Sequence, residues 1–161
     1  MTRLTIRNAE RKDAGMILGF IRDLARYEKA EECVLTDEVQ LAESLFGDGA
    51  NAAGIICLAN DQPIGFAVYF YNYSTWLGRK GLYLEDLYVT PEARGTGAGK
   101  LLLKYLGKLA VTEGCGRFEW SVLDWNTPAI DFYESIGAVA QSEWVGYRLE
   151  GEGLKRFAEA Q

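Results

Sequence analysis

The chain has 161 residues and a formal net charge of −6, and it contains no histidine. Its length suits one domain with a buried core. The acidic balance argues against a nucleic-acid partner, no apolar run is long enough to cross a membrane, and the missing histidine excludes a Ser-His-Asp triad and histidine metal sites.

Two further features favour a cytoplasmic protein without a bound metal. Residues 1–7 alternate polar and apolar side chains, so they read as a strand and not as a signal peptide. The three cysteines, Cys33, Cys57 and Cys115, are odd in number and widely spaced, which suits reduced thiols. Cys57 lies in an apolar run and is expected to fill the core.

The first third of the chain predicts a strand and two helices. Residues 3–7 form the strand. Asp13 is placed to cap a helix that ends near residues 27–32, and its apolar face follows helical spacing through Ile17, Phe20, Ile21 and Leu24. A second, short helix follows Thr36 or Asp37, where a capping box is indicated, and ends at Phe46-Gly47.

The remainder predicts five or six strands, two longer helices and a short one. Strands at 53–59 and 64–71 flank a turn at 60–63 and form a hairpin. A strand at 81–90 leads into a glycine-rich loop, which is followed by a leucine-rich helix that stops at Gly114. The rest comprises a strand at 117–123, a helix after Asn126 that ends at Gly137, one or two more strands, and a short helix at 154–160. This order indicates an α/β protein.

The run 94–100, Arg-Gly-Thr-Gly-Ala-Gly-Lys, is the most informative segment. Its alternate glycines leave backbone N–H groups unshielded where a helix begins, and such groups together with the helix dipole bind anions. A Walker loop ending at Lys100 would need glycine at 94 and a hydroxyl at 101, and a dinucleotide fingerprint would need glycine at 100. Neither pattern fits, so we expect a different phosphorylated cofactor.

The pattern Arg-x-x-Gly-x-Gly at 94–99 resembles the acetyl-CoA pyrophosphate loop of the GNAT N-acetyltransferase superfamily. Three other segments resemble its diamine (spermidine/spermine and thialysine) acetyltransferase branch, namely 24–28, 82–89 and 124–133. The resemblance implies a single domain, 1–161, with a mixed, mostly antiparallel central sheet flanked by helices. It also implies acetyl-CoA as cofactor and a homodimer.

The resemblance assigns the cofactor to one strand, one loop and one helix start. Leu87 and Val89 are implied as backbone contacts beside a bulge in their strand, and one N–H there would stabilise the developing charge on the thioester oxygen. Asn126 matches another cofactor contact. The implied cofactor residues are Leu87, Tyr88, Val89, Arg94, Gly95, Thr96, Gly97, Ala98, Gly99, Lys100, Asn126 and Ala129.

Two residues match the family's catalytic positions. Tyr133 matches the general acid, since a phenol can return a proton to the leaving thiolate; from spacing alone, core packing explains it equally well. Glu85 matches the base that receives the proton of the amine, directly or through a water. Tyr27, Glu28, Glu85 and Asp86 match substrate positions, although Asp86 would lie on the other face of an unbulged strand, and most such acidic clusters are solvated.

The chain departs from the polyamine pattern near its end, where residues 143–147 lack an acidic pair, and at Ser74-Thr75. A diamine or a lysine-like amino acid is therefore at least as plausible a substrate as a long polyamine. Three alternatives stay open at this point: a non-catalytic acyl-CoA sensor, a peptide or protein N-acetyltransferase, and a covalent route through Cys115, which lacks a histidine base.

Overall fold

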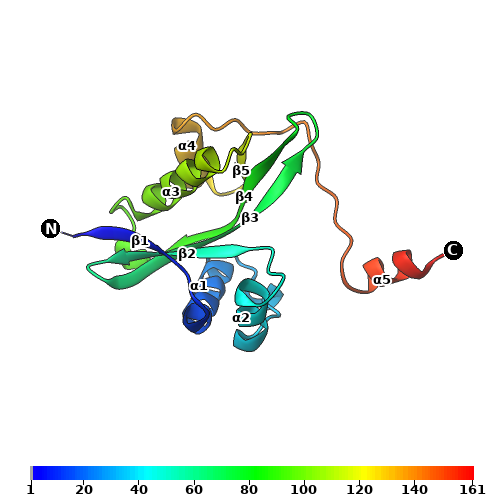
Figure 1. Cartoon of the computed structure of the whole chain (residues 1–161), viewed down its shortest axis with the longest axis horizontal. Helices are drawn as coiled ribbons and strands as arrows, with labels where there is room; N and C mark the ends of the chain where they lie inside the picture. The colour runs from blue at the N-terminus through cyan, green and yellow to red at the C-terminus, as the bar shows by residue number, and fades with distance from the viewer. Residues whose placement is uncertain (1) are drawn as a thin grey trace. The chain divides into compact units, whose positions relative to one another are not determined.

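The computed structural model describes residues 2–161 and contains one sheet flanked by helices (Figure 1). The five strands are β1 Leu4–Asn8, β2 Ala53–Ala59, β3 Gln62–Ser74, β4 Arg79–Val89 and β5 Phe118–Trp120. They lie in chain order, the first four antiparallel and β5 parallel to β4. The expected α/β class with a mostly antiparallel sheet is confirmed.

The described residues form the helices α1 Ala14–Tyr27, α2 Glu38–Phe46, α3 Ala98–Thr112, α4 Thr127–Ser135 and α5 Gly151–Glu159. Of these, α1, α2 and α3 cover the two faces of the sheet. In Figure 1, α1 and α2 lie against one face and α3 against the opposite face. The sheet is therefore the middle layer, and each face of β4 meets a different helix.

By its internal contacts the chain divides into two compact units, the first ending at Leu123 and the second comprising Asp124–Gln161. The sheet and α1, α2 and α3 belong to the first unit, and α4 and α5 to the second. Within the part of the chain that the structure describes, no helix is both long and apolar enough to span a membrane.

The core between α1, α2 and the sheet forms as the helical periodicity predicts. Ile17 is fully buried, and Phe20 stacks on Phe66 of β3 with ring centroids 5.6 Å apart. Ile21 and Leu24 pack at the margin of the same cluster. Cys57 is fully buried on β2, which confirms it as a core residue, and burial raises the pKa of its thiol.

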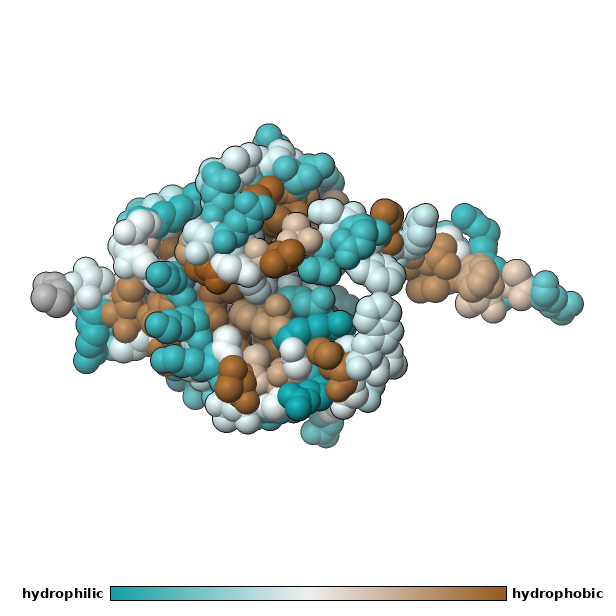
Figure 2. Space-filling model, turned by 90° about the horizontal axis from the view of Figure 1, so that it is seen from above, coloured by the Kyte–Doolittle hydropathy of each residue, from teal (hydrophilic) through white to brown (hydrophobic). Residues whose placement is uncertain are grey.

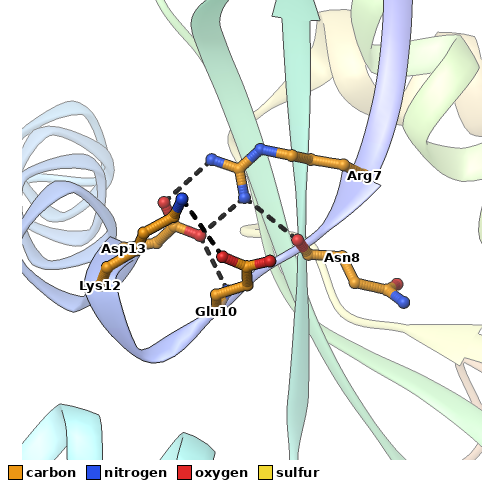
Figure 3. Close-up of polar contacts among 5 residues, drawn as sticks. All are labelled: Arg7, Asn8, Glu10, Lys12 and Asp13. Atoms are coloured by element: carbon orange, nitrogen blue, oxygen red, sulfur yellow. Dashed lines mark hydrogen bonds and ion pairs between the residues drawn. The ribbon is translucent and has the colours of Figure 1, made fainter.

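Asp13 has a different role from the one that its position suggests. It precedes α1, but its side chain makes no capping bond to that helix. Instead its two carboxylate oxygens accept hydrogen bonds of 2.7 and 2.9 Å from the Arg7 guanidinium, and one also accepts the Glu10 N–H (Figure 3). Asp13 therefore joins β1 to the start of α1.

Two other local predictions are confirmed with small changes of boundary. Asp37 caps α2 by accepting the Gln40 N–H at 2.8 Å. The β2–β3 hairpin turns on Asn60 and Asp61, whose φ angles of +48° and +68° suit a tight two-residue turn. Because this turn is short, β3 begins at Gln62, two residues before the expected strand.

The C-terminal part differs most from expectation. β5 has three residues instead of the seven predicted at 117–123, and residues 138–150 form neither helix nor strand. The second unit exposes many of its apolar side chains, and Figure 2 shows hydrophobic atoms at the surface of the C-terminal end, at the right of the view. Phe157 of α5 is 71% exposed and Tyr147 is 97% exposed.

Candidate active site

The chain between β4 and α3 forms an open loop. A 3-10 turn, Pro91–Ala93, follows β4, and α3 begins at Ala98. Gly95 and Gly97 have φ angles of +80° and +90°, a region that side chains rarely allow. Nothing lies within 4 Å of a Cβ placed on either glycine. The backbone here is bare, and a ligand can approach it closely.

The start of α3 adds hydrogen-bond donors to this loop. Its first intrahelical bond runs from the Leu101 N–H to the Gly97 carbonyl, 2.9 Å. The N–H groups of the preceding turn, at Ala98, Gly99 and Lys100, have no carbonyl within the helix. Together with the positive end of the helix dipole, these N–H groups could hold an anion.

β4 carries a bulge at Glu85. Leu84 pairs with Tyr69 of β3 and Asp86 pairs with the adjacent Val68, so Glu85 is an extra residue. Because Val68 and Tyr69 point to opposite faces of the sheet, Leu84 and Asp86 do so as well, although they are two residues apart. The bulge thus moves Asp86 to the face covered by α1. Without it, Asp86 would share the α3 face with Leu84.

The bulge also turns the Tyr88 side chain toward the core under α1 and α2. Tyr88 pairs with Phe66 and belongs to the core cluster under α1 and α2. On the opposite face, Leu87 and Val89 approach Gly99 of α3, at 4.0 Å from a Cβ placed there. After Glu85, Tyr88 therefore faces the core under α1 and α2, whereas Leu84, before Glu85, faces α3. One extra residue between them lets the strand satisfy both.

Two backbone N–H groups of this stretch, those of Leu87 and Val89, point toward the edge of β4 that faces β5. The Thr90 N–H donates to the Ile64 carbonyl beside β3 at 2.8 Å. Successive N–H groups along a strand point to alternate edges. The N–H groups of Leu87 and Val89 consequently point away from β3.

β5 does not reach these donors. It pairs with residues 82–84 of β4 and ends at Trp120, so the described strands leave β4 after its bulge without a neighbour on that edge. The N–H groups of Leu87 and Val89 are therefore available to a carbonyl oxygen between the strands. Such donors stabilise the charge that develops on a thioester oxygen during acyl transfer.

Three carboxylates gather on the α1 side of the bulge. Asp86 is mostly buried, and burial raises its pKa to about 6, with further contributions from the negative charges of Glu85 and Glu28. Glu28, at the end of α1, is half-buried, and burial raises its pKa as well. Glu85 is exposed. The structure thus brings together three of the four residues expected to bind substrate.

Tyr27, the fourth, is linked to the glycine loop through Arg94. The Arg94 guanidinium lies 5.2 Å from the centre of the Tyr27 ring and 5.7 Å from that of Tyr88. Its Nε donates to the Val89 carbonyl at 3.2 Å. The sequence assigned Arg94 to the phosphates alone. No local pattern signals its contact with α1, because the two residues are far apart in the chain.

The remaining expected residues lie in the second unit. Asn126 caps α4, and its side-chain oxygen accepts the Ala129 N–H at 3.4 Å. Pro128 stands in the first turn and Gly137, with φ of +93°, follows the helix end, as predicted. Tyr133 is half-buried on the same helix. Among residues 2–161, no group of three His, Cys, Asp or Glu side chains is arranged to hold a metal ion.

A mixed sheet that opens beside a bulged strand, with a glycine loop and a helix N-terminus at the end of that strand, is the class of fold found in GNAT acetyltransferases. The model of the "Acetyltransferase (GNAT) family" matches residues 15–138. The chain therefore belongs to the GNAT acetyltransferase family.

Proteins with similar sequences indicate which kind of acetyltransferase this chain is. The chain is 37% identical to thialysine N-epsilon-acetyltransferase of Sus scrofa over 169 aligned positions, covering 98% of this chain and 99% of that protein. It is 46% identical to an L-ornithine N5-acetyltransferase of Arabidopsis thaliana over 60% of this chain and 42% of that one. An integron cassette protein of V. cholerae has a similar structure, with a TM-score of 0.82, 30% identity and 98% of both chains covered. The chain is an N-acetyltransferase.

Proposed function

We propose that this enzyme transfers the acetyl group of acetyl-CoA to a primary amine of a small cationic substrate, such as a diamine or a lysine-like amino acid. The observation that carries the proposal is the bulge of β4. It presents carboxylates on the α1 face and free backbone N–H groups at the open edge, within one stretch of strand. A cation and an acyl oxygen can then be held side by side.

The names of the relatives favour an amine at the end of a short chain. Both the thialysine and the ornithine enzyme are named for a side-chain amine of an amino acid. The carboxylates of Glu28, Glu85 and Asp86 would attract such an ammonium group. We also infer that residues 1–161 act as one catalytic domain, since the family match extends across Leu123, where the first unit ends.

The cofactor is proposed to lie along β4 and α3. The loop at 94–100 would hold its pyrophosphate, and the N–H groups of Leu87 and Val89 would receive the acetyl oxygen. Acetyl-CoA supplies the activated acyl group. From the second unit, the resemblance adds Asn126 and Ala129 as cofactor contacts and Tyr133 as the acid.

The reaction is proposed to proceed without an acyl-enzyme. The ammonium group first loses a proton to a carboxylate, and the neutral nitrogen attacks the thioester carbon. As the C–N bond forms and the C–S bond breaks, the nitrogen loses its second proton and the leaving thiolate gains one, which we assign to Tyr133. The net reaction releases one proton for each amide formed.

A thiol-release assay over a panel of amines tests this function. The panel contains thialysine, ornithine, lysine, a diamine, spermidine and a short lysine peptide. We expect turnover of the amino acids and the diamine at a higher kcat/KM than that of spermidine. Activity on the peptide alone would contradict the small-amine assignment and favour a protein acetyltransferase. Calorimetric titration with acetyl-CoA, ATP and NAD checks the cofactor separately.

A cytoplasmic location and a homodimeric assembly are also proposed, on the resemblance to the diamine acetyltransferase branch. The acidic net charge of −6 supports the absence of a nucleic-acid partner.

A further inference from the structure

We propose that the ion pair of Arg117 and Glu119, at the edge strand β5, binds the far end of the substrate, namely the α-carboxylate and α-ammonium groups of an amino acid. Arg117 pairs with the carboxylate and Glu119 with the ammonium group. This inference rests on the function proposed above and narrows its substrate from small amines in general to α-amino acids with a side-chain amine. Neither residue belongs to the segments that carry the family resemblance.

Glu119 lies on the face of the sheet that α1 covers farther along. It pairs with Tyr83 of β4, which in turn pairs with Phe70 of β3. Phe70 stands two residues from Val68, whose side chain belongs to the core cluster under α1, so the two side chains point to the same face. Paired residues of neighbouring strands also share a face. The face that carries the carboxylates of the bulge therefore continues to Glu119.

Three polar side chains meet over Gly81 at this end of the sheet. Oε1 of Glu119 lies 2.9 Å from Nε of Arg117 and accepts a hydrogen bond of 3.2 Å from Nδ2 of Asn72. Asn72 belongs to β3 and reaches β5 across β4, because its partner there, Gly81, has no side chain. A Cβ on Gly81 would collide with Oδ1 of Asn72. The missing side chain thus allows the cluster to form and to hold Glu119 in place.

The cluster offers groups of both signs to a ligand. Within residues 2–161, no hydrogen bond or ion pair involves Oε2 of Glu119 or the two terminal nitrogens of Arg117. A carboxylate oxygen accepts a bond from an ammonium group, and a guanidinium donates to a carboxylate through two nitrogens. The α-carbon of an amino acid carries both partners side by side. A diamine, in contrast, brings no anionic group for Arg117.

The distance along the strands suits a side chain of lysine length. Glu119 stands level with Phe70 of β3, through Tyr83. Asp86 of the bulge stands level with Val68. Phe70 and Val68 are two residues apart, which is about 7 Å along a strand. This is roughly the span from the α-carbon of lysine to its terminal nitrogen. With the α-groups at the ion pair, the terminal amine therefore lies beside the bulge.

The first test uses the wild-type enzyme and three amines: thialysine, its carboxamide, and the diamine that remains when its carboxylate is removed. At saturating acetyl-CoA, thiol release should give a kcat/KM for thialysine roughly 10- to 100-fold above that of the other two, because both lack the charged partner of Arg117. Equal values for the three amines would overturn this inference and leave the proposed function intact. An enzyme that acetylates no small amine would overturn both.

Two variants separate the two roles. Arg117→Gln should raise KM for thialysine roughly 10- to 100-fold without weakening turnover of the diamine, because only the amino acid has a carboxylate. Glu119→Gln should raise KM for both, since each has a second ammonium group. Arg117→Lys keeps the positive charge but not the planar pair of donors, and it should restore part of the preference for thialysine.

Lys80→Gln is the matched control. Lys80 forms an ion pair with Glu113 beside Tyr71, on the other face of β4, and its side chain is 41% exposed, as is that of Arg117. The control should leave KM for thialysine unchanged. Calorimetric titration with acetyl-CoA shows whether each variant is folded, and we expect unchanged binding. An Arg117→Gln enzyme that keeps the wild-type preference for thialysine, or a control that loses it equally, would overturn the inference.

Discussion

Arg7 and Asp13 show what a single residue contributes to this fold. The Asp13 side chain is 7% exposed and that of Arg7 is 35% exposed, and two hydrogen bonds join them. The Arg7 guanidinium lowers the pKa of the Asp13 carboxyl, although burial opposes this effect, and the Asp13 carboxylate raises the pKa of Arg7. A buried carboxylate with these partners ties β1 to α1.

We expect Asp13→Asn to lower the free energy of unfolding by about 1–3 kcal/mol, because the Arg7 guanidinium loses its counter-charge in a half-buried place. Urea denaturation measures this change. The exposed pair Arg3–Asp61 provides a control. Asp61→Asn should leave the midpoint almost unchanged, and equal losses in both variants would contradict the role given to burial.

The same pair predicts a dependence on pH. The pKa of Asp13 is lower in the folded than in the unfolded protein, so its contribution is complete above the unfolded value of about 3.9. It disappears as the pH falls through the lower, folded pKa. The stability difference between wild type and Asp13→Asn should therefore shrink below pH ~4, and a difference that grows in acid would contradict this account.

Tyr133 is the residue whose role depends most on the resemblance. We expect Tyr133→Phe to lower kcat roughly 10²- to 10³-fold, because the leaving thiolate loses its proton donor, with little change in acetyl-CoA binding. Stopped-time thiol release and calorimetric titration measure the two quantities. Tyr73→Phe, at a 61% exposed position of β3, is the matched control. An unchanged kcat would reduce Tyr133 to a packing residue.

Among the elements, the glycine loop and the strand before it are the ones to which the proposed function assigns acetyl-CoA. Gly95 and Gly97 have positive φ angles, whereas Gly99 does not. A Cβ on Gly99 would make only ordinary contacts of 4.0 Å with Leu87 and Val89. Backbone conformation therefore favours glycine at positions 95 and 97 but not at position 99. The even spacing of the three glycines in the sequence does not show this difference.

This difference yields a prediction for the loop. Gly97→Ala should destabilise the protein by about 1–2 kcal/mol, because alanine is strained at this φ angle, and should weaken acetyl-CoA binding. Gly99→Ala should leave stability nearly unchanged. Thermal unfolding and calorimetry measure both effects. If Gly99→Ala instead lowers the melting temperature as much as Gly97→Ala, the conformational explanation is wrong.

Capping and turn residues predicted where helices and strands end better than the sequence predicted which strands pair. Asp37 caps α2 as expected, the helix expected after Asn126 begins there, and Asn60-Asp61 forms the hairpin turn, because these residues act on their immediate neighbours. Asp13 matched the same capping pattern, but the distant Arg7 engages its carboxylate. The expected strand at 117–123 has three residues, since pairing with β4 continues only to Trp120.

At the scale of the whole molecule, the second unit has apolar side chains that it does not bury within itself. Val145, Tyr147 and Phe157 are 73%, 97% and 71% exposed. The proposed homodimer would bury such a surface. Exposed apolar groups of this extent favour association because their removal from water is favourable.

We therefore expect analytical ultracentrifugation to give about twice the chain mass of 17.9 kDa. Introducing charge at this surface with Val145→Asp together with Phe157→Asp should shift the mass toward that of one chain. Val111→Asp, at an 80% exposed position of α3, is the control in the first unit and should leave the mass unchanged. A wild-type monomer at micromolar concentration would contradict the homodimer.

The sequence by itself determined the class of fold, the anion-binding loop and most helix boundaries. Each depends on short-range rules: the period of the apolar residues, the capping side chains, and glycines before a helix. These rules act within a few residues, so they can be read along the chain.

Only the tertiary structure decided where the bulge of β4 lies. It follows from two requirements that no local pattern contains, namely that Leu84 faces α3 and Tyr88 faces the core under α1. One extra residue between them satisfies both. That residue, Glu85, changes the face of Asp86 and the direction of the Leu87 and Val89 N–H groups, because side chains and N–H groups alternate along a strand.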